Sequence, residues 1–214
     1  MFLSKLILNP KSRQVQSEIA NAYQLHRTIM RAFPERLESD ERILFRLEVG
    51  NCNPNPFVLV QSVYEPDWSF LKENTNYISF PISEGIAVKE FQIGLKKGFL
   101  LQFRLLANPT YKKKEGNKSG KRQGILKEEQ QFEWLKRKLN AAGCELLECS
   151  IYDLGIRSSC LKPNTAPIKH LTVLYEGRIR VDEPVSLKRG IISGIGSAKG
   201  FGFGMLSILK IQGN

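Results

Sequence analysis

The sequence predicts an α+β protein made of two ferredoxin-like βαββαβ domains in tandem. Its 214 residues are enough for two small domains that each bury a core. The order of strand-like and helix-like segments is repeated in the two halves, and the opening strands of both halves end alike, in Lys5-Leu-Ile-Leu-Asn-Pro10 and in Arg104-Leu-Leu-Ala-Asn-Pro109. We assign residues 1–85 to the first domain, 86–95 to a linker and 96–214 to the second domain.

The first domain contains four strand candidates and one long helix candidate. The helix is expected over Val15–Phe33, because Ala22, Leu25 and Ile29 recur at helical spacing and Pro34 cannot continue a helix. A short helical turn is expected at 67–73. Runs of apolar and β-branched residues bounded by turn residues predict the strands, which are 2–9, 43–49, 57–64 and 77–81.

The second domain repeats this arrangement. A helix is expected over 127–141, with Phe132, Leu135 and Leu139 on one face and Gly143 as its stop. A shorter helix is expected near 183–189. Strands are expected at 99–107, 145–152, 171–181 and 205–211.

The charge of the chain is unevenly distributed. Residues 1–85 hold 9 Lys+Arg and 10 Asp+Glu, a contribution of −1, whereas residues 86–214 hold 23 and 11, a contribution of +12 to the net charge of +11. A basic half favours a polyanionic partner, nucleic acid rather than membrane, although a basic surface can also serve solubility alone. The four cysteines show no C-x-x-C spacing, which suggests reduced thiols in a cytoplasmic protein.

Tyr23, His26, Arg27 and Arg31 form one ridge of the first helix, because they are spaced three or four residues apart. An imidazole can take a proton from a ribose 2′-hydroxyl or give one to a leaving oxygen, and arginines can neutralise phosphate charge. The ridge therefore suits phosphodiester cleavage. On spacing alone, a histidine at the edge of the core with a structural hydrogen bond is the simpler interpretation.

A lysine-rich tract spans Thr110–Arg122 and contains six basic residues, one acidic residue and two glycines. This composition predicts a loop that can follow a phosphate backbone, the alternative being a solvated loop without contacts. The basic residues of the tract are Lys112, Lys113, Lys114, Lys118, Lys121 and Arg122.

A glycine-rich segment spans Gly194–Gly204, and Lys199 adds a positive charge to it. It lacks the Lys-Ser/Thr pair of a phosphate-binding P-loop, and a strand rather than a helix follows it. The segment could allow close approach to a ligand or serve sheet packing only. Its glycines are Gly194, Gly196, Gly200, Gly202 and Gly204.

Several kinds of site are not indicated. The sequence has no acidic cluster for a two-metal nuclease, no G-x-S-x-G motif and no metal-ligand spacing. We therefore expect catalysis without a metal or cofactor, and no membrane association. An enzyme that uses a phosphate cofactor at the glycine-rich segment is a poorly supported alternative.

Taken together, these motifs resemble the CasE (Cse-type) CRISPR repeat-processing endoribonucleases of type I-E systems, over nearly the whole chain. The glycine-rich segment departs from the family pattern at Ser197, where a proline is usual, and at Phe203, where a small residue is common. The segments that carry the resemblance are Leu3-Ser-Lys-Leu-Ile-Leu-Asn, Tyr23-Gln-Leu-His-Arg27, Leu59-Val-Gln-Ser, Phe103–Pro109, Gly120–Arg122, Trp134–Leu139, Tyr175–Gly177, Gly194–Lys199 and Gly204–Ser207.

The resemblance implies tandem ferredoxin-like (RRM-like) domains and metal-independent cleavage of a repeat hairpin in precursor CRISPR RNA. It implies attack by a 2′-hydroxyl, which leaves a 2′,3′-cyclic phosphate and a 5′-hydroxyl, and retention of the guide RNA inside a Cascade complex with other protein subunits. The family's catalytic residues fall on His26 and Tyr23, and RNA-binding positions on Arg27, Arg31 and the basic residues of the second domain. A subunit that binds the hairpin without cleaving it is the competing interpretation.

Overall fold

The computed structural model describes residues 1–35, 42–50, 55–73, 76–79, 81–112, 120, 122–162 and 165–211. The chain divides into two compact units, which we call the N-terminal unit and the C-terminal unit. The N-terminal unit comprises Met1–Ile93, Ser159–Ile168 and Gly200–Gly202. The C-terminal unit comprises Gly94–Ser158, Lys169–Lys199 and the chain from Phe203 onward.

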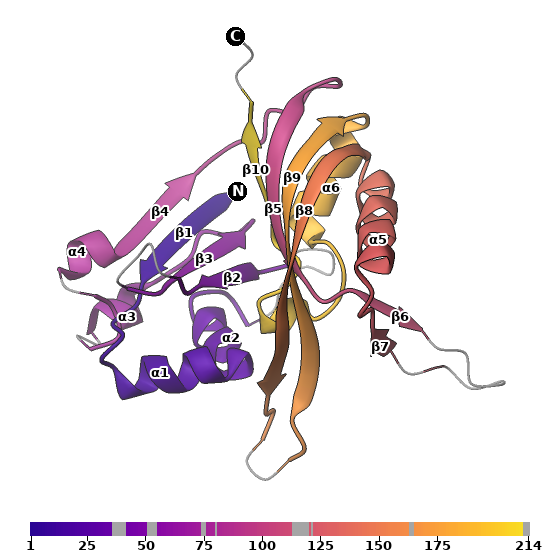
Figure 1. Cartoon of the computed structure of the whole chain (residues 1–214). Coiled ribbons are helices and arrows are strands. Elements are labelled where there is room, and N and C mark those ends of the chain that lie inside the picture. The colour runs from indigo at the N-terminus through magenta and orange to yellow at the C-terminus, as the bar shows by residue number, and fades with distance from the viewer. Residues whose placement is uncertain are drawn as a thin grey trace. The chain divides into compact units, whose positions relative to one another are not determined.

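A four-stranded antiparallel sheet forms the N-terminal unit together with its helices (Figure 1). Its strands are β1 (Phe2–Ile7), β2 (Leu44–Glu48), β3 (Phe57–Ser62) and β4 (Ile86–Glu90), in the order β2-β3-β1-β4. The first strand thus lies between the third and the fourth, and both of its pairings are antiparallel. This is the order of a βαββαβ ferredoxin-like unit, so the predicted fold is confirmed for this half.

The fourth strand of this sheet corrects the sequence-based expectation. The run 77–81 was expected to be the strand, but among its described residues, 77–79 and 81, only Ile78 makes a bridge, to Leu8. Tyr77 and Ile78 are neighbours and both are buried, so their side chains do not alternate as those of a strand at a sheet surface do. The fourth strand is β4, which falls in the expected linker and is mostly exposed. An exposed edge strand lacks the apolar pattern that would have predicted it.

Two helices replace the single helix expected over Val15–Phe33. They are α1 (Arg13–Ala20) and α2 (Ala22–Met30). Between them Asn21 has φ −131° and ψ 91°, which is extended backbone, and its side chain caps the start of α2. An asparagine side chain competes with helical hydrogen bonds and favours such a cap, so the helix divides at this residue.

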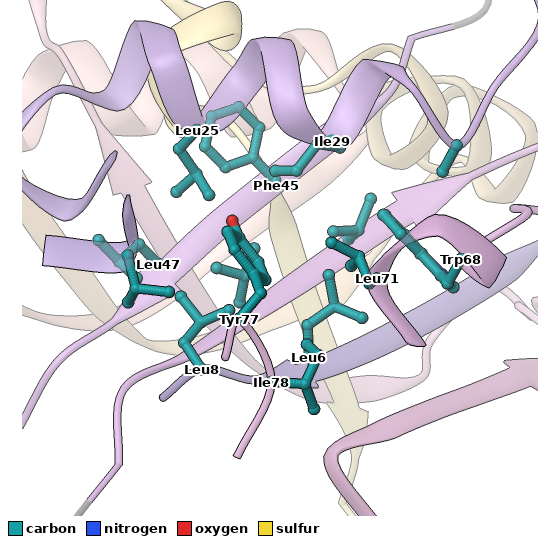
Figure 2. Packing of buried hydrophobic residues seen from close by; sticks show 14 of the residues in the cluster. Leu6, Leu8, Leu25, Ile29, Phe45, Leu47, Trp68, Leu71, Tyr77 and Ile78 are labelled. Atoms are coloured by element: carbon teal, nitrogen blue, oxygen red, sulfur yellow. The ribbon is translucent and has the colours of Figure 1, made fainter. Parts of the chain in front are cut away.

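The core of the N-terminal unit lies between these helices and the sheet (Figure 2). Leu25 and Ile29 of α2 pack towards Phe45 of β2, and each of these two residues is 1% exposed. Helix α3 (Ser69–Glu73) adds Leu71, and α4 (Ile82–Gly85) precedes β4. The apolar stripe expected from helical spacing is thus confirmed, although the helix that carries it is shorter.

The C-terminal unit has a second four-stranded sheet with the same strand order. Its strands are β5 (Leu100–Ala107), β8 (Cys144–Ser159), β9 (Ile168–Val181) and β10 (Leu206–Lys210), in the order β10-β5-β9-β8. Strands β8 and β9 are longer than expected, because their outer halves form an extended hairpin (Figure 1). The repeat inferred from the sequence is therefore confirmed at the level of topology.

Two helices and a small hairpin complete this unit. Helix α5 (Glu128–Ala141) buries Trp134, Leu135 and Leu139, and it ends before Gly143, whose φ is +78°. Helix α6 (Pro184–Ser193) buries Leu187 and Ile191. The hairpin of β6 (Thr110–Lys112) and β7 (Arg122–Gly124) had not been expected, because the lysine-rich tract Thr110–Arg122, which contains β6 and the start of β7, is poor in strand-forming residues and was predicted to be a loop.

Candidate active site

The start of α2 is held by the side chain of Asn21. Its Oδ1 accepts a hydrogen bond from the Tyr23 backbone N–H at 3.3 Å, and its Nδ2 donates to the Cys160 carbonyl at 3.0 Å. Cys160 lies in the connection between β8 and β9, in the part that belongs to the N-terminal unit. One amide therefore sets both where α2 begins and which loop lies beside that beginning.

Glu18 joins α1 to α2 through a buried hydrogen-bond network. Its carboxylate accepts from Thr28 Oγ1 at 2.8 Å, from the Tyr77 hydroxyl at 2.5 Å and from Gln14 Nε2 at 2.9 Å. Burial, with the Glu18 charge and hydrogen bond, raises the pKa of Tyr77, which therefore stays a hydrogen-bond donor. Thr28 follows His26 by two residues, so this network fixes the helix that carries the histidine. The sequence analysis had not singled out Glu18.

The imidazole of His26 is half-buried and stacks on Phe45. The ring centroids are 6.0 Å apart and the planes differ by 14°. Gly200 lies at the ring as well, because a methyl group on its α-carbon would be 3.7 Å from Nε2 and from Cδ2. Burial lowers the pKa of His26, which favours the neutral imidazole. Within the described residues, the buried Nδ1 has no hydrogen-bond partner.

The simpler interpretation of His26 is a structural histidine with a satisfied hydrogen bond, and the lack of a described partner for Nδ1 argues against it. A histidine kept for structure normally has both of its buried nitrogens hydrogen-bonded. Here the ring is packed between a phenyl group and a glycine, while one polar atom remains unsatisfied. A group in that state is a candidate for proton transfer.

The other residues of the predicted ridge have different surroundings. Tyr23 lies near Phe201, with ring centroids 6.3 Å apart and planes tilted by 33°. Arg27 is exposed, and within the described part of the chain its guanidinium makes one long contact, 3.5 Å, with Gln24 Oε1. Arg31 lies at the end of α2, where its guanidinium is 4.2 Å from the Phe70 ring centroid. Arg31 is thus engaged with an aromatic ring rather than with Tyr23 or His26.

The glycine-rich segment contributes Gly200, Phe201 and Gly202 to the N-terminal unit. Gly202 has φ +84°, and a methyl group there would be 3.1 Å from Phe45 Cε2. The same phenyl ring thus contacts His26 on α2 and Gly202 in the loop. Sequence reasoning did not anticipate this meeting, because 174 residues separate His26 from Gly200 and only the fold brings them together.

A basic groove of about 210 Å³ lies on the C-terminal unit. Lys112 and Arg122, which are paired in the register of β6 and β7, line it with Arg137 and Lys138 of α5. The other lining residues are Thr110, Tyr111, Trp134, Gly196 and Ser197. The groove therefore holds four cationic side chains and no carboxylate among the described residues.

Two of these cations had not been predicted as site residues. Arg137 and Lys138 belong to Lys136-Arg-Lys138 on the polar face of α5, where a cluster of charge is also typical of a solvated surface. The structure adds that they share one groove with Lys112 and Arg122. Lys199 is half-buried at the start of a 3₁₀ turn that runs to Phe201. The predictions for Lys113, Lys114, Lys118 and Lys121 lie outside the described residues.

The described ranges contain neither a metal-binding cluster nor a membrane-spanning helix. No group of three or more His, Cys, Asp or Glu residues in them could hold a metal ion. Among the same residues, no helix is long and apolar enough to cross a membrane.

Three comparisons with known proteins identify the family. The chain belongs to the CRISPR-associated protein family, whose model matches residues 1–210. It is 36% identical to the CRISPR-associated endoribonuclease Cse3 of Thermus thermophilus, over 97% of this chain and 99% of that protein. It is 30% identical to the Cascade subunit CasE of Escherichia coli, over 99% of this chain and all of that subunit.

A solved structure supports the same assignment. The structure of Cse3 bound to a 19-nucleotide RNA matches 98% of this chain and all of that chain, with 34% identity and a TM-score of 0.85. The resemblance read from the sequence is thus confirmed, together with the tandem ferredoxin-like fold.

Proposed function

We propose that this protein is a metal-independent endoribonuclease. It binds the repeat hairpin of precursor CRISPR RNA and cleaves the strand at the 3′ base of that hairpin. The relative named as an endoribonuclease supports the class of reaction. The single observation that carries the proposal is the His26 imidazole, desolvated between Phe45 and Gly200 and beside Tyr23 in sequence and on the helix.

The proposed reaction needs no water and no metal. The ribose 2′-oxygen attacks the neighbouring phosphorus, the bond from phosphorus to the 5′-oxygen breaks, and the products carry a 2′,3′-cyclic phosphate and a 5′-hydroxyl. One proton leaves the 2′-hydroxyl and one is delivered to the 5′-oxygen. A neutral imidazole can accept the first, so the lowered pKa of His26 supports a role as general base.

Tyr23 and Arg27 would act on the phosphate. A phenol is a poor base near neutral pH but a good hydrogen-bond donor, and an exposed guanidinium can neutralise charge that develops on the phosphate oxygens. The backbone at Gly200–Gly202 has room for close approach, because Gly200 carries no side chain on the side of the imidazole. These groups would surround the scissile phosphate from α2 and from the loop.

The basic groove of the C-terminal unit would hold the RNA stem by its phosphates. An A-form stem is recognised mainly through its backbone, which suits four cations without a carboxylate. The proposed contacts are Lys112, Arg122, Arg137 and Lys138. Further candidates are Arg31, Lys199, Lys113, Lys114, Lys118 and Lys121. After cleavage the protein would remain on the guide RNA in the cytoplasm as a Cascade subunit; the relative named as a Cascade subunit supports the assembly.

Incubation of a labelled cognate repeat RNA with the protein in EDTA tests the proposal. The wild type should cleave, and His26→Ala should bind the RNA without cleaving it. Equal cleavage by both proteins would remove His26 from the mechanism. Tight binding without cleavage by either protein would instead identify an RNA-binding structural subunit. Sensitivity of the 3′ end to acid, which opens a cyclic phosphate, tests the product separately.

A further inference from the structure

Exposed apolar side chains are concentrated on β8. Among the described residues, twelve large hydrophobic side chains are exposed, and five of them fall between positions 147 and 161. Tyr152, Leu154 and Ile156 follow one another at every second position and are 47%, 50% and 63% exposed. We call these three side chains the β8 apolar patch. Single exposed hydrophobics are ordinary on a protein surface, but a local group of them marks an interaction site.

The patch lies on an edge strand. In the order β10-β5-β9-β8, β9 is the only described neighbour of β8. Natural proteins usually protect such edges with short strands, charges or bulges. Here the edge strand is 16 residues long and carries apolar side chains over part of its length, so within the patch its protection is limited to the charge of Asp153 and the positive-φ Gly155.

A kink within the patch limits how a partner could bind. Gly155 has φ +76° and no atom within 4 Å of the position where a side chain would start, and its N–H donates to Asp153 Oδ1 at 2.7 Å. A positive-φ glycine in an edge strand interrupts the regular row of backbone donors and acceptors. A partner would therefore contact the apolar side chains rather than extend the sheet by a long added strand.

Charge distinguishes strand β8 from the basic groove of the C-terminal unit. Strand β8 carries Glu145, Glu148 and Asp153 against one cation, Arg157, a net charge of −2 in a chain of net charge +11. Glu148 and Glu145 form ion pairs with Arg178 and Arg180 of β9. These pairs occupy the neighbouring guanidinium groups, so the strand offers little to a phosphate backbone. Since both glutamates are paired, Asp153 is the carboxylate that lies within the patch itself, and an apolar surface with one exposed carboxylate fits a protein partner instead.

We infer that the β8 apolar patch docks a neighbouring protein subunit, through apolar and basic side chains of that subunit. The inference rests on the proposed assembly of this chain into a Cascade complex, and it does not depend on RNA cleavage. The patch would then be the protein–protein contact of a chain whose other interactions are with RNA. Asp153 would face the basic side chains of the partner.

Co-expression of a tagged chain with the other Cascade subunits of its host and a guide RNA tests the inference. The double variant Leu154→Ser/Ile156→Ser should lower the amount of recovered subunits per guide RNA at least tenfold. The isolated variant should still cleave the repeat RNA at the wild-type rate. Asp153→Asn keeps the acceptor for the Gly155 N–H but removes the charge. This variant should recover fewer subunits than the wild type but more than the double variant, and high salt should lower the recovery by the wild type to the same extent. Val185→Ser, at a 64% exposed valine of α6, is the matched control and should assemble normally.

Each other outcome has a definite meaning. Normal assembly of the Leu154/Ile156 variant would overturn the inference. A wild-type chain that cleaves RNA but recruits no subunit would overturn both the docking and the Cascade part of the proposed function, and leave the nuclease part standing. A change in self-association by light scattering, without a change in assembly, would assign the patch to a second copy of this chain and overturn the inference.

Discussion

The phenyl ring of Phe45 stacks on the imidazole of His26, with centroids 6.0 Å apart, and also meets the backbone at Gly202. Phe45 comes from β2 and is 1% exposed, so it is fixed in the core of the N-terminal unit. A rigid aromatic surface on one side of the histidine sets the ring orientation and removes water from it. The same contact thus explains both the geometry and the lowered pKa of His26.

The first prediction concerns the pH dependence of cleavage. Because burial lowers the pKa of His26 below 6.5, the neutral base persists to lower pH than in a free histidine. The acid limb of the single-turnover rate should therefore have its midpoint below pH 6.5. Phe45→Leu exposes the ring and should move the midpoint up towards 6.5. A wild-type midpoint at or above 6.5 would contradict the general-base assignment.

The second prediction concerns the phenol of Tyr23. Tyr23→Phe keeps the ring that lies near Phe201 and removes only the hydroxyl. Loss of a hydrogen-bond donor to the reacting phosphate should lower the single-turnover rate on the order of 100-fold, as for other donors to developing charge. The dissociation constant of uncleaved RNA should not change. If the rate is unchanged, Tyr23 serves only in packing.

The third prediction separates backbone strain from contact with the Phe45 ring. Gly202 and Gly98 have nearly equal φ values, +84° and +83°, but only Gly202 has a neighbour, the Phe45 ring at 3.1 Å. Ala at either position should cost roughly 1–2 kcal/mol of stability from the left-handed backbone. Only Gly202→Ala should also slow cleavage, because its methyl group displaces Phe45 from the imidazole. Equal cleavage by the two variants would show that Phe45 does not set the position of His26.

The fourth prediction concerns RNA binding by the basic groove. Lys138 lines the groove, whereas Lys136 on the same helix is exposed and is not among the lining residues. Lys138→Ala should weaken binding of uncleaved RNA and reduce the slope of log K against log salt concentration by about 1, because one phosphate contact is lost. Lys136→Ala should leave the slope unchanged. Identical slopes for the two variants would show that the RNA does not bind in this groove. Lys121→Ala tests the lysine-rich tract in the same way.

The sequence predicted those elements that depend on local periodicity. The apolar face of α5 and the stripe of Leu25 and Ile29 follow from side-chain spacing, the stop at Gly143 follows from the freedom of glycine to adopt positive φ, and all three are observed. Asn21 was overlooked because the stripe continues across it, although its extended backbone ends one helix and its side chain caps the start of the next. A capping residue inside a periodic stripe is a weak signal unless its hydrogen bonds are known.

The composition of the candidate site was predictable only in part. Tyr23 and His26 share a helix, so their spacing was enough to group them. Phe45 and Gly200 reach the same imidazole from β2 and from the glycine-rich loop, and no local pattern links those segments. Arg137 and Lys138 looked like solvated helix residues until the β6–β7 hairpin was placed beside them. Contacts that tertiary structure creates leave no periodic trace in a single sequence.

The last prediction concerns Glu18, whose buried carboxylate is 5% exposed and accepts hydrogen bonds from both Thr28 and Tyr77. Glu18→Gln replaces one acceptor oxygen by a donor, which cannot serve both hydroxyl groups equally well. We expect a loss of about 1–3 kcal/mol in the free energy of unfolding, measured by urea denaturation. Glu129→Gln, at an exposed glutamate of α5, should change it by less than about 0.5 kcal/mol.

A role of Glu18 in positioning α2 predicts more than this loss of stability. At a temperature where the variant is fully folded, its cleavage rate should fall while its affinity for RNA stays the same, because Thr28 no longer fixes the turn of helix after His26. In a double-mutant cycle with Tyr77→Phe, the effects on stability should be coupled by at least about 0.5 kcal/mol, since both changes remove the same hydrogen bond. Additive effects, or a wild-type cleavage rate in the folded variant, would reduce Glu18 to a local contributor to stability.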